Sequence, residues 1–466
     1  MGIQRWNPFG FQVTASERAR RFGRHATVVI ATKGLDSRGD FLPTGRWGEL
    51  PELCCHPASD QFKQDGSRCT LDSRFACCLL VGFLLIVPLL YLDYNRTTPT
   101  APSVLEAMQP YWGTYFMLPE QQHWHATAID EAVTEARESL GALAGCEGFE
   151  IVFTSGGTES NQLAIAGLLG TQHNAGRPQR GGHILVSALE CDSVLDTVQR
   201  LARQDPSWTV EQIPIAGNGL IDPQTVEQMI CGETRLVCVQ AANPILGTIQ
   251  PVAAIGELCA HRGVHLHCDA TQVFGKIPVN VKQMKVDTAS ISSHKFYGPK
   301  GVGALYVRRG LAMEGIHGGD AGEMGLRPGS PNVTGIVGMG AAAQLAERFS
   351  LTAEDPLEEL RDQFIARLEQ AMPDPPAVIA APSETLPNTV AIEMPDEIDL
   401  LKRSARDLVM NSATCFDPPD YFVRSLRAIG MTDRQIRRSV SFSLGWTTSN
   451  EQIERAAEWI AAAYYR

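Results

Sequence analysis

The stretch "SISSHKFYGPKGVG", residues 290–303, places a lysine directly after a run of small and apolar residues. That run, residues 288–293, is short and bounded by turn residues, which is typical of a buried strand. Lys295 follows it, and Gly298 and Pro299 then interrupt regular structure. We therefore expect the Lys295 side chain to lie at the carboxyl end of a buried strand.

Short apolar runs alternate with amphipathic stretches around this lysine. The expected strands are residues 150–155, 183–188, 235–240, 263–269, 288–293 and 303–308. The expected helices are residues 158–170, 193–204, 222–231 and 252–262. This alternation predicts an α/β fold with a largely parallel sheet, in which ligands bind at the carboxyl ends of the strands.

The pattern changes after about residue 345. A helix over 355–371 is followed by a strand over 389–394 and by helices near 396–406, 420–429 and 450–464. We expect a large domain over 91–345 and a small α+β domain over 346–466. The large domain begins with residues 91–105, a segment that is able to pack on the small domain.

The first 90 residues differ in composition from the rest. Residues 1–74 hold 11 Lys and Arg against 8 Asp and Glu, although the whole chain has a formal net charge of −12. Five of the 12 cysteines lie in residues 1–90, without the paired CxxC motifs of a zinc site. We expect this part to be an extension outside the folded domains, and we expect no metal site.

Residues 75–92, "FACCLLVGFLLIVPLLYL", carry no charge and reach the lower edge of transmembrane length. One interpretation is a membrane anchor. A second is a secretory signal, although the run lies far from Met1 for that role. We favour a third, in which residues 1–86 are not part of the natural product. Translation would then begin at a non-standard codon now read as Val87, just before the folded sequence starts.

The composition bounds the class of partner. With 44% hydrophobic and 20% charged residues the chain is ordinary for a folded, soluble protein. Its negative charge argues against a nucleic-acid surface, because phosphate binding needs clustered Lys and Arg. Small molecules or protein partners fit better. The cysteines beyond residue 90 are scattered through apolar segments, which is typical of a reduced, cytoplasmic protein.

A carboxylate is expected beside the lysine. Asp269 ends the strand over 263–269, and Gln272 follows it. Lys295 follows the next strand, so both groups are expected at one sheet edge. A lysine that forms a Schiff base and a carboxylate that keeps a ring nitrogen protonated suit a pyridoxal 5'-phosphate (PLP) site. The alternative is a surface lysine and a strand-end aspartate without a shared role.

A third element points to the same cofactor. The motif "TSGGTESN" joins the strand over 150–155 to a helix through Gly156, Gly157 and Thr158. Unpaired N–H groups at a helix start, with the helix dipole behind them, form an anion site suited to the cofactor phosphate. Taken alone, the motif is equally compatible with a plain helix cap made by Ser155 or Thr158.

These motifs resemble those of the cysteine desulfurases, a group of the class V aminotransferases. The matching segments are "EIVFTSGGTESN", "HCDATQVFGKIPV", "SSHKFYGPKGVGALYVRRG", "RPGSPNVTGIVGMGAA" and "SFSLGWTTSNEQIE". The resemblance runs from residue 91 to the carboxyl end, about four fifths of the chain. It implies the fold-type-I architecture of PLP enzymes, with a mostly parallel seven-stranded sheet flanked by helices and a small α+β domain.

The resemblance also implies roles for individual residues. Lys295 matches the Schiff-base lysine, Asp269 the partner of the pyridine nitrogen, and Gln272 the donor to the cofactor's phenolic oxygen. The phosphate cradle matches Gly157, Thr158, Ser292 and His294. Ser330 matches a threonine that reaches the phosphate of the neighbouring subunit, which implies a homodimer.

A second reactive group is implied on a loop of the small domain. In the segment "MNSATCFDPPDYFV", Cys415 matches the nucleophile that takes sulfur from bound L-cysteine as a persulfide. Asp417 and Pro418 favour an exposed loop, from which a sulfur-acceptor or iron–sulfur scaffold protein would collect the sulfur. The alternative is a buried cysteine of the small-domain core.

Three positions depart from the family pattern on the substrate side. Cys191 stands where the family has a histidine stacked on the cofactor ring, and Pro244 where it has an asparagine that donates to the cofactor. Ser441 replaces the arginine that clamps the substrate's α-carboxylate. Loss of that clamp is expected to weaken substrate binding roughly tenfold to more than a hundredfold unless another base substitutes.

Neighbouring residues are candidates to compensate. Asn243 is a candidate to replace the donor lost at Pro244, and Arg437 and Arg438 are candidates for the lost carboxylate clamp, unless they are solvated charges at a helix end. Three hypotheses follow: a divergent cysteine desulfurase, a PLP-dependent lyase or aminotransferase for a different amino acid, or a cofactor-binding protein without turnover.

Overall fold

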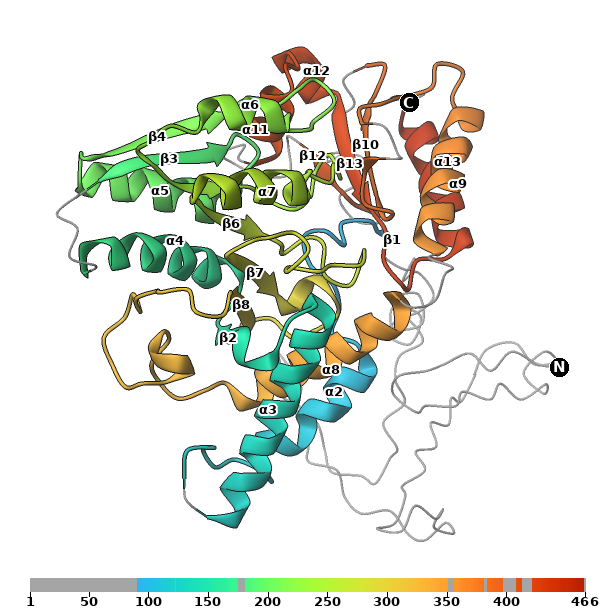
Figure 1. Cartoon of the computed structure of the whole chain (residues 1–466). Coiled ribbons are helices and arrows are strands. Elements are labelled where there is room, and N and C mark those ends of the chain that lie inside the picture. The colour runs from blue at the N-terminus through green and yellow to red at the C-terminus, as the bar shows by residue number, and fades with distance from the viewer. Residues whose placement is uncertain are drawn as a thin grey trace, which may run out of the picture. The chain divides into compact units, whose positions relative to one another are not determined.

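The computed structural model describes residues 90–121, 123–174, 181–350, 356–380, 384–396, 408–412 and 421–464. Its main feature is a seven-stranded sheet in the order β2-β8-β7-β6-β5-β3-β4 (Figure 1). The strands are β2 (Ile151–Thr154), β3 (Gly182–Ser187), β4 (Trp208–Ile213), β5 (Thr234–Cys238), β6 (His265–Asp269), β7 (Thr288–Ser292) and β8 (Gly303–Val307). Neighbouring strands are parallel from β4 to β7, whereas β8 is antiparallel to β7 and β2. The predicted mostly parallel, seven-stranded α/β fold is confirmed.

Helices cover both faces of this sheet. They are α2 (Pro102–Met108), α3 (Trp124–Ala144), α4 (Gly157–Asn174), α5 (Asp192–Gln204), α6 (Pro223–Met229), α7 (Val252–Arg262) and α8 (Val333–Ser350). Alternation along β5 shows how the faces divide, because successive strand residues point to opposite sides. Leu236 joins the core beneath α4 and α5, whereas Val237 joins the larger core beneath α3, α6, α7 and α8.

Local sequence explains where two of these helices begin and end. Asp222 caps α6, since its carboxylate accepts from the backbone N–H groups of Gln224 and Thr225. Pro223 occupies the first helical position, where its missing N–H has no cost. α7 ends at Gly263, whose φ of 66° is a left-handed conformation that glycine adopts without strain.

A second sheet carries its own core. It is antiparallel, in the order β12 (Asn411–Ser412), β13 (Ser439–Ser443), β10 (Thr389–Glu393) and β9 (Ala377–Val378). Its helices are α9 (Pro356–Ala371), α11 (Tyr421–Ala428), α12 (Asp433–Arg437) and α13 (Asn450–Tyr464). Phe364 of α9 and Phe442 of β13 are fully buried and meet edge to face, with ring centroids 5.1 Å apart.

The first described residues link the two sheets. β1 (Leu90–Tyr91) pairs in parallel with β11 (Leu408–Val409), and Leu92 is buried in the core of the four-stranded sheet. The chain then crosses to the seven-stranded sheet, where the backbone N–H of Thr98 donates to the carbonyl of His294 at 3.0 Å. α8 is one continuous helix through residue 345, where the predicted domain boundary falls.

Short 3-10 helices complete the described chain: η2 (Gln109–Trp112), η3 (Gly148–Glu150), η4 (Ser293–Lys295) and η5 (Glu323–Gly325). The predicted helix near 396–406 falls mostly outside the described residues, as do residues 75–89 of the apolar run. Within the described ranges, no helix combines the length and apolar character needed to cross a bilayer.

The aromatic pair of the second core gives a stability prediction. Phe364→Ala removes a fully buried ring and leaves a cavity, so we expect the free energy of unfolding to fall by about 3–5 kcal/mol. Urea unfolding measures this change. Phe149→Ala is the control, because Phe149 is 51% exposed. Equal effects of the two variants would contradict the packing described here.

Candidate active site

Lys295 ends η4, directly after β7, and its amine is held against the backbone of the 92–98 segment. The Nζ atom donates to the carbonyl of Asn95 at 2.5 Å and to that of Arg96 at 3.0 Å. Burial lowers the pKa of Lys295 to about 8, assisted by the charge of Arg96 and opposed by that of Asp269. A minor fraction of this amine is therefore neutral, and nucleophilic, at pH 7, far more than for a free lysine.

Asp269 ends β6, the strand beside β7, and its backbone lies opposite Ser290. One carboxylate oxygen accepts from the Thr271 backbone N–H at 3.0 Å and hydroxyl at 2.7 Å. The other accepts from Asn161 Nδ2 at 2.9 Å and from the Cys191 thiol at 3.1 Å. Burial raises the pKa of Asp269, but these hydrogen bonds outweigh it and the pKa lies below its usual value. The carboxylate therefore stays ionised at neutral pH.

A chain of buried polar groups supports Asp269 from behind. Asn161 on α4 donates to Asp269 and accepts from His267 Nε2 at 3.0 Å. Burial lowers the pKa of His267 to about 4, although Asp269 opposes the shift, so the ring is neutral at physiological pH. Its Nδ1 atom then accepts from the Thr288 hydroxyl at 2.9 Å. This series of hydrogen bonds fixes the orientation of the Asn161 carboxamide.

Seven of the predicted site residues line one cavity of about 620 Å³: Gly157, Thr158, Asp269, Gln272, Ser292, His294 and Lys295. This volume lies within the range of roughly 300–1,000 Å³ typical of small-molecule sites. Gly157 begins α4, and a Cβ atom there would approach Thr271 Cγ2 to 2.6 Å. The absence of a side chain lets the helix start meet the cavity, where its N–H groups favour an anion.

Gln272 is held by a second buried lysine that sequence reasoning missed. Lys276 Nζ donates to Gln272 Oε1 at 2.7 Å and to Asn95 Oδ1 at 2.6 Å. Gln272 in turn donates to the Asn95 carbonyl at 3.1 Å. Burial lowers the pKa of Lys276 well below its usual value, and the charge of Lys295 adds to this effect. The sequence offered one signal for this contact: Lys276 lies four residues after Gln272.

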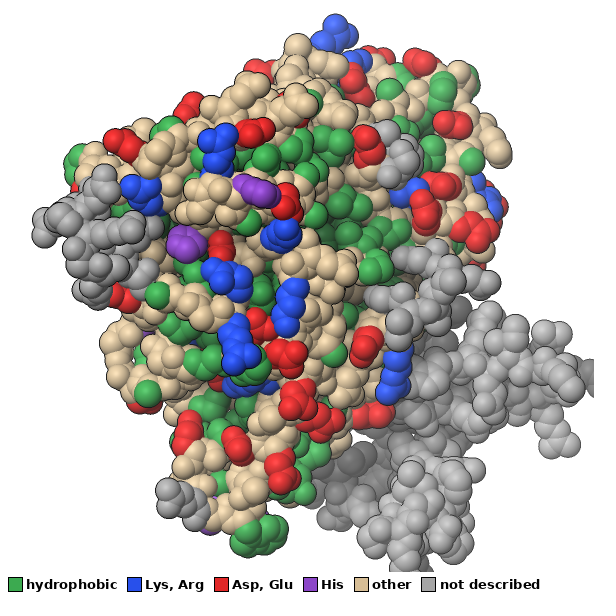
Figure 2. Space-filling model, viewed as in Figure 1, with side chains coloured by type: hydrophobic (Ala, Val, Ile, Leu, Met, Phe, Trp, Pro, Cys, Tyr) green, Lys and Arg blue, Asp and Glu red, His purple; other side chains and the backbone are tan. Residues whose placement is uncertain are grey.

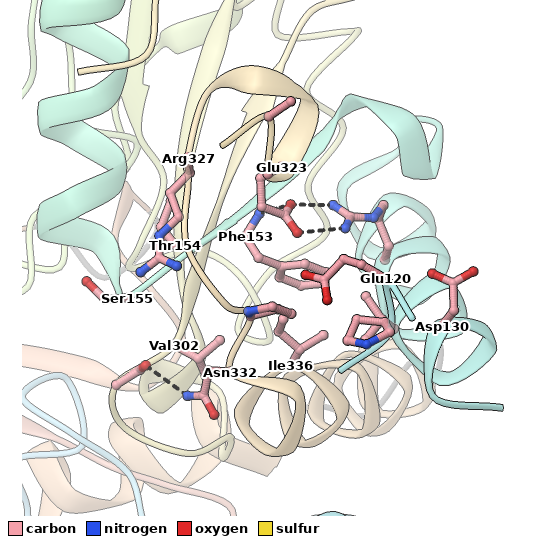
Figure 3. A pocket seen from close by; sticks show the side chains of 18 residues that line it. Glu120, Asp130, Phe153, Thr154, Ser155, Val302, Glu323, Arg327, Asn332 and Ile336 are labelled. Carbon is pink, nitrogen blue, oxygen red and sulfur yellow. Dashed lines mark hydrogen bonds and ion pairs between the residues drawn. The ribbon is translucent and has the colours of Figure 1, made fainter. Parts of the chain in front are cut away.

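Two of the predicted residues lie elsewhere. Ser330 is exposed in the loop before α8 and does not line the cavity of Lys295. Its neighbours Gly329 and Pro331 line a second pocket, of about 320 Å³, which shares Ser155 with the first (Figure 3). Cys415 lies outside the described residues.

An ion pair forms one side of the second pocket. Arg137 of α3 donates two hydrogen bonds, of 2.7 and 2.9 Å, to Glu323 of η5. Dashed lines mark these bonds at Glu323 in Figure 3. Glu323 also accepts from the backbone N–H of Phe153 at 2.8 Å. These contacts fix the loop after β8 against α3 and β2. The loop that carries Ser330 is thereby anchored near the cavity.

Two of the three positions that depart from the family pattern line the cavity of Lys295. Cys191 lines it, and burial beside Asp269 raises the pKa of its thiol well above the usual value, so the side chain is a neutral donor. Pro244 lines it as well. The Ser441 hydroxyl is buried and donates to the carbonyl of Ile245 at 2.7 Å, which leaves no cation at that position.

The candidates for compensation do not reach the cavity. Asn243 is fully buried, donates to Tyr421 and Ser425, and does not line the cavity wall. The suggestion that it replaces the donor lost at Pro244 is therefore wrong. Arg438 pairs with Glu393, and neither it nor Arg437 lines the cavity.

Comparisons with known proteins agree with this geometry. Residues 90–400 match the family model of the class-V aminotransferases. The chain is 33% identical to a mouse cysteine desulfurase over 377 residues, which cover 79% of this chain and 80% of that protein. It is 38% identical to the cysteine desulfurase IscS of Anaeromyxobacter dehalogenans, with 79% of this chain and 90% of the relative covered.

Solved structures agree as well. A NifS-like protein superposes with a TM-score of 0.73 at 28% identity, covering 81% of this chain and 99% of the other. SspA, solved in complex with cysteine, gives a TM-score of 0.66 at 31% identity and covers 76% of this chain and 98% of the other.

The seven-stranded sheet, with an amine and a carboxylate at adjoining strand ends, defines an α/β enzyme of the aminotransferase type. The chain belongs to the class-V aminotransferase family, in its cysteine desulfurase group. This family is PLP-dependent, and the family predicted from the sequence is confirmed.

The state of Lys295 gives a pH prediction. Below a pKa of about 8 the amine is protonated and unreactive, so its modification by an aldehyde with a reductant should rise with pH and level off above 8. Peptide mass spectrometry between pH 6 and 10 follows this rate. In denaturant the midpoint should move toward about 10.4, the value of a free lysine. A folded midpoint equal to the denatured one would contradict the burial of this amine.

Proposed function

We propose that the chain is a PLP-dependent cysteine desulfurase, which converts L-cysteine to L-alanine and leaves a persulfide on Cys415. The observation that carries this proposal is the cavity in which the partly neutral amine of Lys295 and the ionised carboxylate of Asp269 meet. A structural relative solved with cysteine supports the substrate.

The residues of the cavity fit PLP. Asp269 would hold the pyridine nitrogen, Gln272 the phenolic oxygen, and Lys295 the aldehyde carbon. The phosphate would lie at the start of α4, with Gly157, Thr158, Ser292 and His294 around it. Burial lowers the pKa of His294 to about 4, together with the charges of Lys295 and Lys300, so this ring serves as a neutral hydrogen-bonding group. When bound, the cofactor supplies an electron sink.

The chain's own groups then handle protons and position. Lys295, once released by the incoming amino group, is placed to take the proton from the substrate's α-carbon and to return one later. Its lowered pKa suits this role near neutral pH. Asp269 stays ionised and Asn161 keeps it oriented, so its charge faces the cofactor nitrogen throughout.

Sulfur transfer requires a thiolate from outside the described residues. The Cys415 thiolate would attack the substrate sulfur, forming a sulfur–sulfur bond as the carbon–sulfur bond breaks. The electron pair of the broken bond stays with the carbon skeleton, which takes up a proton to give alanine. The persulfide would then pass to a sulfur-acceptor or iron–sulfur scaffold protein.

A second candidate function rests on the altered substrate side. Ser441 supplies no cation and Cys191 no imidazole, which favours a PLP-dependent lyase or aminotransferase for a different amino acid, or a cofactor-binding protein without turnover. Both alternatives use the same cofactor half of the site, and turnover assays separate them from the desulfurase.

We also infer a homodimer, in which Ser330 reaches the cofactor phosphate of the partner. Large apolar side chains are exposed on the segment before α3 and at its start: Trp112 is 73% exposed, Phe116 72% and Trp124 74%. Figure 2 shows charges of both signs interspersed over the face that it presents. Three large apolar side chains exposed so close together in the sequence support a protein partner for this segment.

The remaining assignments complete the proposal. We propose a large PLP-binding domain over residues 91–345, a small domain over 346–466, and an extension over 1–90. We infer a cytoplasmic location, which is supported by the cysteines: the six described ones are all free thiols.

The desulfurase assay tests the function directly. Protein loaded with PLP is expected to release alanine and, with a thiol reductant, sulfide from L-cysteine in equal amounts. Lys295→Ala should abolish both products. Cys415→Ser should abolish sulfide while the visible absorbance of the bound cofactor remains. Products from other amino acids but not from L-cysteine would instead establish the second candidate function.

The dimer has its own test. Phe116→Glu places a charge in the proposed interface and should shift the mass by light scattering from dimer toward monomer. Phe149→Glu, at another exposed aromatic position, should leave the dimer intact. A monomeric wild type would overturn the proposal, together with the role of Ser330.

A further inference from the structure

We propose that Arg96 binds the α-carboxylate of the amino-acid substrate, in place of a cation on β13. This inference rests on the proposed function, since it assigns the carboxylate subsite of the same cavity. Arg96 follows β1 in the segment that crosses between the two sheets, and it lines the cavity with Lys295 and Asp269.

The backbone of Arg96 is fixed next to the reactive amine. Its carbonyl accepts from Lys295 Nζ at 3.0 Å, and its N–H donates to the carbonyl of Asp93 at 2.9 Å. On the preceding residue, the N–H of Asn95 donates to Ser443 Oγ at 2.9 Å and the side chain to Thr389 Oγ1 at 2.8 Å. These contacts hold the base of the Arg96 side chain at the mouth of the site.

Substrate chemistry places a carboxylate in the same region. An α-amino acid that exchanges with Lys295 brings its nitrogen to the position of that amine, and its carboxylate carbon is then only two bonds away. A side chain that starts beside Lys295 Nζ is therefore well placed to reach the carboxylate. Arginine suits this task, because its planar guanidinium donates two parallel hydrogen bonds to a carboxylate.

The charge of Arg96 already acts on this part of the cavity. It lowers the pKa of Lys295, second only to burial, and contributes to the lowered pKa of His294. Among the described lining residues, the cations are Arg96, Lys295 and Lys300. Lys295 has the role of the amine, and Lys300 lies in the loop after η4, beside Gly301. Among these three cations, Arg96 alone carries a guanidinium group.

Two other arginines of the described residues, Arg438 and Arg424, lie outside the cavity. Arg438 pairs with Glu393 and donates to the carbonyl of Pro395 at 2.6 Å. Arg424 pairs with Asp192 and donates to a backbone carbonyl at 2.9 Å. No described residue of β13 lines the cavity, and Ser441 on that strand is a neutral hydroxyl.

The test compares ligands with and without a carboxylate. PLP-loaded protein is titrated with L-cysteine and cysteamine, and with L-alanine and ethylamine, while the absorbance of the bound cofactor is followed. Arg96→Gln should raise the dissociation constants of both amino acids roughly tenfold to more than a hundredfold. Those of the two amines should stay within about twofold. Arg96→Lys should lie between, because it keeps the charge but loses the planar fork.

Two further variants sharpen the result. Arg437→Gln is the matched control: Arg437 is an exposed arginine that does not line the cavity, so the amino acid to amine ratio should not change. Ser441→Arg in the Arg96→Gln background should restore part of the lost amino-acid affinity. Ser441 lies opposite Asn411, which lines the cavity, so an arginine there is placed to enter it.

Equal weakening of amino acids and amines by Arg96→Gln would overturn the carboxylate role, as would unchanged binding of all four ligands. Selective weakening of both amino acids would support it even if the wild type releases no sulfide from L-cysteine. In that case the desulfurase function fails while the carboxylate subsite stands. If the wild type and Arg96→Gln release sulfide from L-cysteine equally well, the desulfurase function stands and the carboxylate role of Arg96 fails.

Discussion

The hydrogen bonds that keep Asp269 ionised are the constraint on which the rest of the site depends. A carboxylate at this depth would take up a proton if burial acted alone. Thr271, Asn161 and Cys191 prevent this by donating to both of its oxygens, and His267 orients Asn161 from behind. The parallel pairing of β6 and β7 then brings this charge and the Lys295 amine to one edge of the sheet.

A segment that is distant from Lys295 in the sequence completes this edge of the sheet. Residues 92–98 leave the core of the four-stranded sheet and supply both carbonyls that hold Lys295, as well as the side chain of Arg96. The substrate side of the cavity is thus built where the two sheets meet. The serine at position 441 is therefore compatible with binding of the substrate's carboxylate, because we propose that Arg96 of the 92–98 segment supplies the cation.

The sequence predicted the interior strands and the helices between them, because their apolar runs are continuous or follow helical spacing. It did not predict α2, α3 or α8. It missed β4, whose mostly exposed residues at the sheet edge leave no apolar run. The site residues with motif context, such as Asp269 and Lys295, were predicted to share one cavity, and they do. Asn161 and Arg96 were missed because their partners are far away in sequence and only the fold brings them together. Lys276 was missed although one of its partners, Gln272, lies only four residues before it; its other partner, Asn95, is distant in sequence.

The most direct measurement of the central claim is to locate the cofactor. The protein is incubated with PLP, reduced with borohydride, digested, and analysed by peptide mass spectrometry. We predict one pyridoxyl group, on Lys295, and its loss or marked weakening in Asp269→Ala, with Lys276 unmodified. A pyridoxyl group on Lys276 or on surface lysines, with Lys295 free, would contradict the account.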